Sequence, residues 1–163
     1  MKELPSGLKM ATVWLLAGLA VFLGVQAYLS QQRSTRFEAV GDSVQIRRAA
    51  DGHYHWPAKV NGRAVDFLVD TGATRSALPA SLARELELPV EGRVQSQTAG
   101  GAVEGQVVRA DLDLRGGVRV ERLRIVALPA LEAPLLGMDV LGKLHWSQSD
   151  GVLSIDLKGD GSR

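Results

Sequence analysis

The sequence predicts a small, mostly-β domain, a closed barrel or sandwich with one or two short helices, preceded by a transmembrane helix. Two observations predict this fold class. Short apolar runs separated by glycine turns recur through the second part of the chain, and residues 10–32 carry no charge. The chain therefore divides into four segments, an N-terminal flank over 1–9, a transmembrane anchor or uncleaved signal over 10–30, a linker over 31–52 and a β domain over 53–163.

The composition excludes several functional classes. The chain of 163 residues has 19 Lys and Arg against 18 Asp and Glu, so its net charge of +1 gives no basic field for nucleic acid. It contains no cysteine, which excludes disulfides, thiolate catalysis and cysteine-based zinc sites. The hydrophobic share of 45% is typical of a globular chain rather than a disordered one.

The uncharged segment suits a membrane helix. Residues 10–25 are nearly all apolar, with Lys2 and Lys9 before them and Arg33 and Arg36 after them. A bilayer core takes about 20 apolar residues as helix, and a buried helix of a globular protein usually keeps a polar stripe that this segment lacks. We therefore expect an anchor with an exported C-terminal domain, although the small residues near its end would also allow cleavage as a signal peptide.

The β domain is predicted to begin with a hairpin and a short helix. Apolar-rich runs over 54–60 and 64–69 flank Asn61 and Gly62, the preferred centre of a tight two-residue turn. Residues 79–86 begin with proline and place apolar residues at helical spacing, which predicts a short helix there.

Further strands and glycine turns follow. Residues 94–98 and 103–114 surround Gly100 and Gly101, and apolar and charged residues alternate along the second run. This pattern predicts a second hairpin. The remaining elements are a strand over 118–127, a short apolar turn or helix over 135–144 and a last strand over 152–157.

The chemistry is predicted to lie at Asp70. This carboxylate follows the apolar run 67–69 and precedes a hydroxyl residue, Thr71, and then Gly72. Thr71 can hydrogen-bond to the backbone, and Gly72 allows a sharp turn and the close approach of another segment. A carboxylate held in this way can act as an acid or a base. The ordinary alternative is an Asx-type turn in which the aspartate only caps its own backbone.

The segment 67–74 resembles the active-site motif of retropepsin-like aspartic proteases, the retroviral branch of the aspartic peptidases. Residues 135–141, Leu-Leu-Gly-Met-Asp-Val-Leu, are similar to the family's segment that crosses behind the catalytic turn. Residues 98–101, Thr-Ala-Gly-Gly, resemble the tip of its flap hairpin. The resemblance covers 53–157 and implies a retropepsin-like β lobe. With the N-terminal apolar segment, the arrangement is similar to membrane-anchored bacterial members, which implies an inner-membrane protein with an extracytoplasmic domain.

The resemblance also implies the roles of individual residues. Asp70 would be the catalytic carboxylate, and Thr71 and Gly72 would hold its turn. The substrate would be an extended polypeptide bound by strand-like hydrogen bonds, and no cofactor or metal is implied. The residues implied to lie beside the substrate are Ala73, Thr98, Gly100, Gly101 and Leu136.

The number of catalytic carboxylates predicts a homodimer. Aspartic proteases use two carboxylates that share one proton, and this chain has one Asp-Thr-Gly. The other Asp-Gly pairs, at 51–52 and 150–151, lack the hydroxyl residue and the preceding buried strand. We therefore expect the second carboxylate to be Asp70 of another copy, with the active site on a two-fold axis and an acidic to mildly acidic pH optimum.

The dimer contact is expected to differ from that of the retroviral members. Those proteins often carry an acidic residue two positions after the Asp-Thr-Gly glycine and an arginine after the downstream glycine, which help to brace the dimer. The corresponding residues here are Thr74 and Met138. The last strand, 152–157, could instead supply an intermolecular sheet, or it could be an edge strand of the monomer.

Other candidate residues have simpler interpretations. His53 and His55 would share one strand face and could bind a metal with His145, but nothing in the sequence brings His145 near them, so no metal site is predicted. Trp56 and Trp146 are expected to pack. A set of arginines would form an exposed strand face or contact anionic lipid headgroups, namely Arg115, Arg119, Arg122 and Arg124.

The sequence thus predicts a membrane-anchored aspartic endopeptidase that hydrolyses peptide bonds with water activated by two Asp70 carboxylates. The alternative is a retropepsin-like module that no longer cleaves and instead dimerises or binds peptides. The intact Asp70, Thr71 and Gly72 favour the enzyme, because a scaffold has no need of two facing carboxylates.

Overall fold

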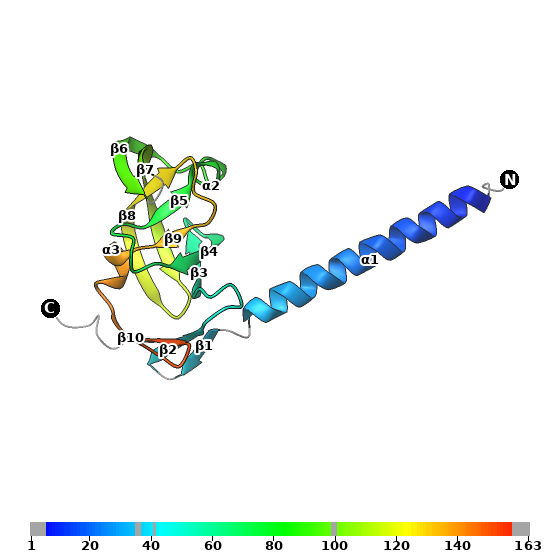
Figure 1. Ribbon diagram of the computed structural model, residues 1–163, viewed down its shortest axis with the longest axis horizontal. Helices are drawn as coiled ribbons and strands as arrows, with labels where there is room; N and C mark the ends of the chain where they lie inside the picture. The colour runs from blue at the N-terminus through cyan, green and yellow to red at the C-terminus, as the bar shows by residue number, and fades with distance from the viewer. Residues whose placement is uncertain (1–5, 35–36, 41, 99–100, 158–163) are drawn as a thin grey trace. The chain divides into compact units, whose positions relative to one another are not determined.

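The computed structural model describes residues 6–34, 37–40, 42–98 and 101–157 (Figure 1). The chain forms two compact units, Met1–Arg36 and Phe37–Arg163. The second unit begins well before position 53, where the sequence predicted the start of the β domain.

The first unit contains one helix, α1 (Ser6–Ser34), so the helical character predicted for 10–30 is confirmed. Its described side chains over 12–25 are exposed. Within the described part of the chain, no helix has both the length and the apolar character needed to cross a membrane. The predicted transmembrane anchor is therefore not supported.

The second unit is built around a closed β-barrel, which confirms the predicted fold class. Its seven strands are arranged in the order β3-β4-β9-β5-β8-β7-β6 (Figure 1). A further pairing of β3 with β7, from Ala58 opposite Leu114 to Val60 opposite Leu112, closes six of these strands into the barrel, while β6 pairs with β7 outside this ring. The strands are β3 (His55–Val60), β4 (Arg63–Val69), β5 (Ala77–Pro79), β6 (Val90–Thr98), β7 (Gly101–Leu114), β8 (Val118–Leu128) and β9 (Leu135–Leu136).

Both predicted hairpins are present. β3 and β4 are joined by Asn61 and Gly62, whose φ values of 47° and 84° are those of the left-handed turn that this residue pair favours. β6 and β7 pair from Val90 opposite Val108 to Thr98 opposite Gly101. The tip of this hairpin, with Gly100, lies outside the described residues.

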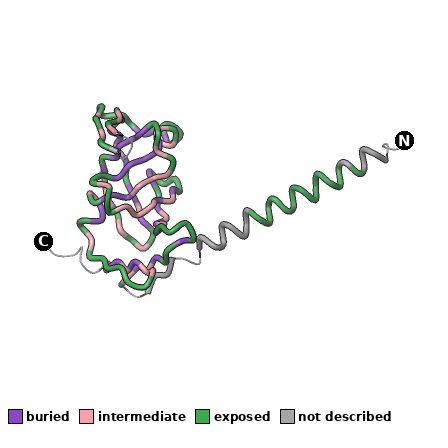
Figure 2. Tube along the Cα trace, in the orientation of Figure 1, coloured by how far each residue is buried: buried purple, intermediate pink, exposed green. Residues whose placement is uncertain are grey.

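The core fills the barrel interior. Trp56, Phe67, Leu112 and Ile125 are fully buried, and Figure 2 shows the buried segments running along the barrel strands. The predicted alternation along β7 is confirmed, since apolar residues from Ala110 to Leu114 are buried between more exposed charged ones. Nε1 of Trp56 also donates a hydrogen bond to the carbonyl oxygen of Arg115, so this tryptophan packs as expected.

A second, four-stranded sheet contains strands that the sequence did not predict. Its order is β1-β2-β11-β10, and β1 (Phe37–Val40) and β2 (Ser43–Arg47) occupy the stretch predicted to be a linker. β10 (His145–Ser149) was also missed, and its Trp146 is 36% exposed rather than packed. The inner face of this sheet is apolar and belongs to the same core as the barrel, through Val44, Ile46, Leu153 and Ile155.

The last strand, β11 (Val152–Asp156), lies in the middle of this sheet. It pairs with β10 on one side and with β2 on the other. Both of its edges are therefore occupied within the chain. The intermolecular sheet considered for this strand would require one of these pairings to open first.

Two short helices complete the unit, as expected. α2 (Ala80–Glu85) follows Pro79, which occupies its N-cap position, and buries Ala83. α3 (Met138–Leu141) follows Gly137 and buries Val140 and Leu141.

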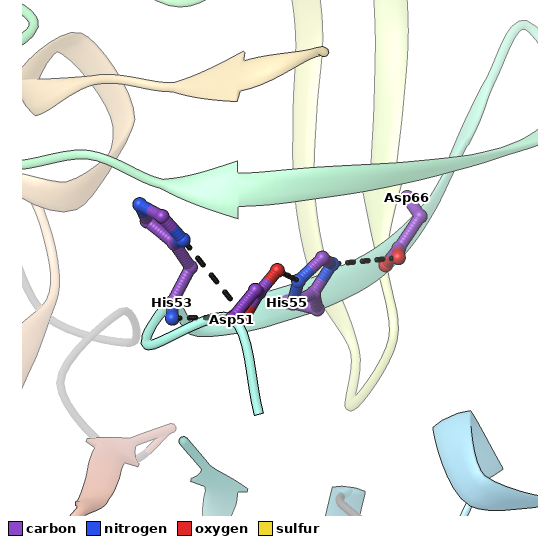
Figure 3. A network of polar contacts seen from close by, with 4 residues as sticks. All are labelled: Asp51, His53, His55 and Asp66. Atoms are coloured by element: carbon purple, nitrogen blue, oxygen red, sulfur yellow. Dashed lines mark hydrogen bonds and ion pairs between the residues drawn. The ribbon is translucent and has the colours of Figure 1, made fainter. Parts of the chain in front are cut away.

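A histidine held by two carboxylates joins the segment after β2 to the barrel (Figure 3). Nε2 of His55 lies 2.8 Å from Oδ2 of Asp51, and its Nδ1 lies 2.9 Å from Oδ2 of Asp66. The backbone N–H of His53 donates to Oδ1 of Asp51 at 3.0 Å. This contact, followed by the hydrogen bond from His55, lowers the pKa of Asp51.

The lowered pKa predicts a specific pH dependence of stability. A carboxyl with a lowered folded pKa stabilises the fold above its ordinary pKa of about 3.9, and this contribution is lost as the pH falls through the folded value. We expect Asp51→Asn to melt at a lower temperature than the wild type at about pH 6, because the variant loses the carboxylate's stabilising contacts. The difference should be only a few degrees, since the site is exposed and its contribution is small. The two melting temperatures should converge near about pH 3. Asp150→Asn, at another exposed turn, is the matched control. A difference that persists unchanged in acid would contradict the assignment.

Candidate active site

Asp70 stands at the end of the barrel strand β4, between two neighbouring strands. β4 pairs in antiparallel with β3 and in parallel with β9, with Val69 opposite Leu136. The N–H of Val69 donates to the carbonyl of Tyr54 at 2.9 Å, and the N–H of Asp70 donates to the carbonyl of Leu136 at 3.0 Å. The backbone that carries the carboxylate is therefore held from both sides.

A tight turn orients the Asp70 carboxylate. The N–H of Gly72 donates to Oδ1 of Asp70 at 2.8 Å, and the N–H of Ala73 donates to the Asp70 carbonyl at 3.3 Å. A Cβ at position 72 would lie 3.2 Å from Oδ1, so glycine relieves the approach. The Asx-type turn considered from the sequence is thus present. It engages one carboxylate oxygen, while Oδ2 has no hydrogen-bond partner within the described residues.

The segment of β9 and α3 lies directly against this turn. The N–H of Met138 donates to the carbonyl of Ala73 at 2.8 Å, and the N–H of Asp139 donates to that of Thr74 at 3.2 Å. A Cβ at Gly137 would lie 2.5 Å from the carbonyl carbon of Arg75, which excludes any side chain there. The crossing expected of residues 135–141 is therefore seen, and Gly137 makes it possible.

A buried serine and an aspartate lock the two segments together. Ser76 is fully buried, and its N–H and hydroxyl donate to Oδ1 of Asp139 at 2.9 and 2.7 Å. Its Oγ in turn accepts from the N–H of Gly137 at 3.1 Å. The sequence analysis missed this pair. The one available indication was a polar residue at position 76 directly before the apolar Ala77 and Leu78.

The other predicted site residues differ in burial and in their distance along the chain from Asp70. Ala73 is partly buried, while Thr71 and Gly72 are exposed beside the carboxylate. Leu136, predicted to line the substrate site, is fully buried, so its side chain packs in the core and only its carbonyl serves Asp70. Thr98 and Gly101 face each other at the end of the β6–β7 hairpin. Gly100 and the side chain of Thr98 lie outside what the structure describes.

The three histidines considered as metal ligands are not grouped as such a site would require. His53 and His55 contact Asp51, whereas His145 begins β10 in the other sheet. Within the described ranges, no three His, Asp or Glu side chains are grouped as metal ligands would be.

The fold agrees with that of known proteins. The family model described as aspartyl protease matches residues 56–140, more than half of the chain, so the chain belongs to the aspartyl protease family. No curated protein matches the chain at a significant level.

Solved structures of retropepsin-like proteases share the fold. A retropepsin-like aspartic protease from Rickettsia conorii is 23% identical, with a TM-score of 0.59, over 73% of this chain and 92% of that one. The protease of EIAV, solved with the inhibitor HBY-793, is 21% identical over 57% of this chain and 88% of that one, with a TM-score of 0.48. The likeness to the Rickettsia conorii structure confirms the mostly-β, retropepsin-like fold expected from the sequence.

The Ser76–Asp139 lock predicts a large effect of a small substitution. Ser76→Ala leaves the buried N–H of Gly137 without a partner and removes one donor to Asp139, which should cost about 1–3 kcal/mol of unfolding free energy. Denaturant unfolding of the full chain measures this loss. Ser81→Ala, at an exposed position of α2, is the control and should change stability little. Equal stability of the two variants would show that the lock contributes nothing.

Proposed function

We propose that this chain is an aspartic endopeptidase that works as a homodimer, in which the two Asp70 carboxylates, one from each copy, together activate a single water. The observation that carries the proposal is the state of the Asp70 carboxylate. One oxygen is fixed by the N–H of Gly72, and the other has no partner among the described residues. Membership of the aspartyl protease family supports a protease activity.

The engagement of the other aspartates supports a second copy as the source of the second carboxylate. Asp51 is held by His53 and His55, and Oδ1 of Asp139 accepts two hydrogen bonds from Ser76. Asp150 lies in the turn between β10 and β11. Each of these three carboxylates has a separate structural position in the fold. A two-fold axis at Asp70 would supply the second carboxylate that the reaction needs, as Asp70 of the other copy.

The proposed reaction is a direct attack by water. The ionised carboxylate of the pair takes a proton from water as the water oxygen attacks the peptide carbonyl carbon. At the same time, the protonated carboxyl donates its proton to the carbonyl oxygen. The tetrahedral intermediate then collapses as the nitrogen leaves with a proton from the pair. The two carboxyls titrate as one unit, because like charges so close cannot both ionise.

The proposed substrate is an extended polypeptide. It would lie between the turn at Ala73 and the β6–β7 hairpin, where backbone groups can bind it as a strand. A location outside the cytoplasm stays a prediction from the sequence, and no step of the proposed reaction depends on it.

Removal of the carboxylate tests the proposal. We expect Asp70→Asn to reduce cleavage of an unstructured protein by about 100-fold or more at acidic to neutral pH, since a missing acid–base group costs this much. Asp150→Asn should cleave like the wild type. Absence of cleavage by a wild-type chain that sedimentation shows to be dimeric would contradict the enzyme. It would favour the non-catalytic dimerising or peptide-binding module instead.

A mixing experiment tests the shared active site. An excess of Asp70→Asn added to a constant amount of wild-type chain should lower the total activity, because exchange produces mixed dimers with a single catalytic carboxylate. An equal excess of bovine serum albumin controls for competition by added protein. Activity that stays constant while labelled subunits are shown to exchange would mean that one copy is sufficient.

A further inference from the structure

A basic groove lies beside the catalytic loop. We use this name for a recess of about 300 Å³ between β8, the loop after Asp70 and the end of α3. Four cationic side chains line it, together with two carboxylates. These six residues are Arg75, Arg122, Arg124, Lys143, Glu121 and Asp139.

Three of the four cations of this groove have no side-chain partner among the described residues. Arg75, Arg122 and Lys143 make no side-chain hydrogen bond or ion pair with the described residues, and Arg124 lies 3.6 Å from Glu91. Four other arginines of the same unit are each paired with a carboxylate, Arg63 with Glu85, Arg93 with Glu104, Arg109 with Glu91 and Arg119 with Asp113.

The carboxylates of the groove do not cancel this charge. Asp139 is engaged by Ser76 through Oδ1, and four cations against two carboxylates leave an excess of two positive charges. Like charges gathered in one recess repel one another, so an anion there would be stabilised, above all by the three cations that have no partner of their own among the described residues.

The backbone conformation at Arg122 also supports a functional role for this groove. Its φ of 51° lies in the left-handed region, which an arginine adopts only when its surroundings impose it. The pairing of β7 with β8 is irregular between Ala110 and Leu112, and Oδ1 of Asp111 holds the Arg122 N–H at 2.7 Å. Such bulges re-aim side chains, often next to functional sites.

The position of the groove indicates its ligand. Arg75 follows Asp70 by five residues, and five residues of chain span at most about 18 Å. An extended substrate at Asp70 therefore needs only about five or six residues to reach the groove. Arginine side chains bind carboxylates through paired hydrogen bonds, and a recess suits side chains of a peptide better than the flat face of a membrane.

We propose that the basic groove binds an acidic stretch of the polypeptide substrate, and so selects substrates with Asp or Glu a few residues from the bond that is cut. This inference rests on the proposed function for the identity of the polypeptide as a substrate. The binding itself can be measured without cleavage.

The experiment uses the full chain and a fluorescent peptide pair at about pH 6, where glutamate is ionised. Each peptide has the same apolar centre, flanked about six residues away by a run of Glu in one and of Gln in the other. Binding is measured by anisotropy with Asp70→Asn, which does not depend on turnover. Cleavage is measured with the catalytic chain. Arg75→Gln, Arg122→Gln and Lys143→Gln are combined in one variant, and Lys59→Gln, Arg84→Gln and Arg93→Gln give a control with the same change of charge.

We expect the Glu peptide to bind about tenfold more tightly than the Gln peptide, since each exposed ion pair contributes less than about 1 kcal/mol. The groove variant should lose this preference and the control variant should keep it, with equal cleavage of the Gln peptide by both. A preference that survives in the groove variant, or is lost equally in the control, would overturn the proposal. So would groove-dependent binding to anionic vesicles without any preference between the peptides.

The two proposals fail in different ways. If the Gln peptide is cleaved but no groove-dependent preference for Glu exists, the groove proposal is wrong and the protease stands. If the Glu peptide binds through the groove but neither peptide is cleaved, the groove is a peptide site and the proposed catalysis is wrong.

Discussion

The structure of the site depends on one close approach of two backbone segments, the loop after Asp70 and the turn at Gly137. At this point there is no room for a side chain on residue 137. Because the segments touch, β9 can run parallel to β4 and its Leu136 carbonyl can receive the N–H of Asp70. The position of the carboxylate therefore follows from a contact between main chains, and side-chain packing of the barrel only has to maintain it.

The two aspartates of this region, Asp139 and Asp70, differ in how their carboxylates are hydrogen-bonded. Asp139 receives two hydrogen bonds from Ser76 through one oxygen and ties α3 to the loop after Asp70. Asp70 receives one from Gly72. A carboxylate whose hydrogen bonds are used to join segments is poorly suited to exchange protons, whereas one that is oriented and left partly without partners is suited to it. Near these two aspartates, the cations of the basic groove supply a positive field, and three of the four have no side-chain partner among the described residues.

The sequence was sufficient for features encoded by neighbouring residues. The hairpin at Asn61 and the alternation along β7 are local patterns, and the motif around Asp70 is contiguous. What it could not supply depends on distant partners. Ser76 and Asp139 are 63 positions apart, and only the fold makes them a pair. β10 has no buried residue and hence no periodicity to find, while β2 contributes only Val44 and Ile46 to the core and becomes a strand through β11.

The four-stranded sheet has a consequence for how activity would be controlled. Its strands come from both ends of the second unit and satisfy one another within a single chain, with β11 in the middle. A subunit built in this way can complete its main sheets before it meets a partner, so folding and association become separate events. A protease whose two subunits fold independently would be inactive at low concentration and active at high local concentration, where the dimer forms by mass action. The local concentration of the protein would then control activity, as a removable inhibitory segment does in other proteases.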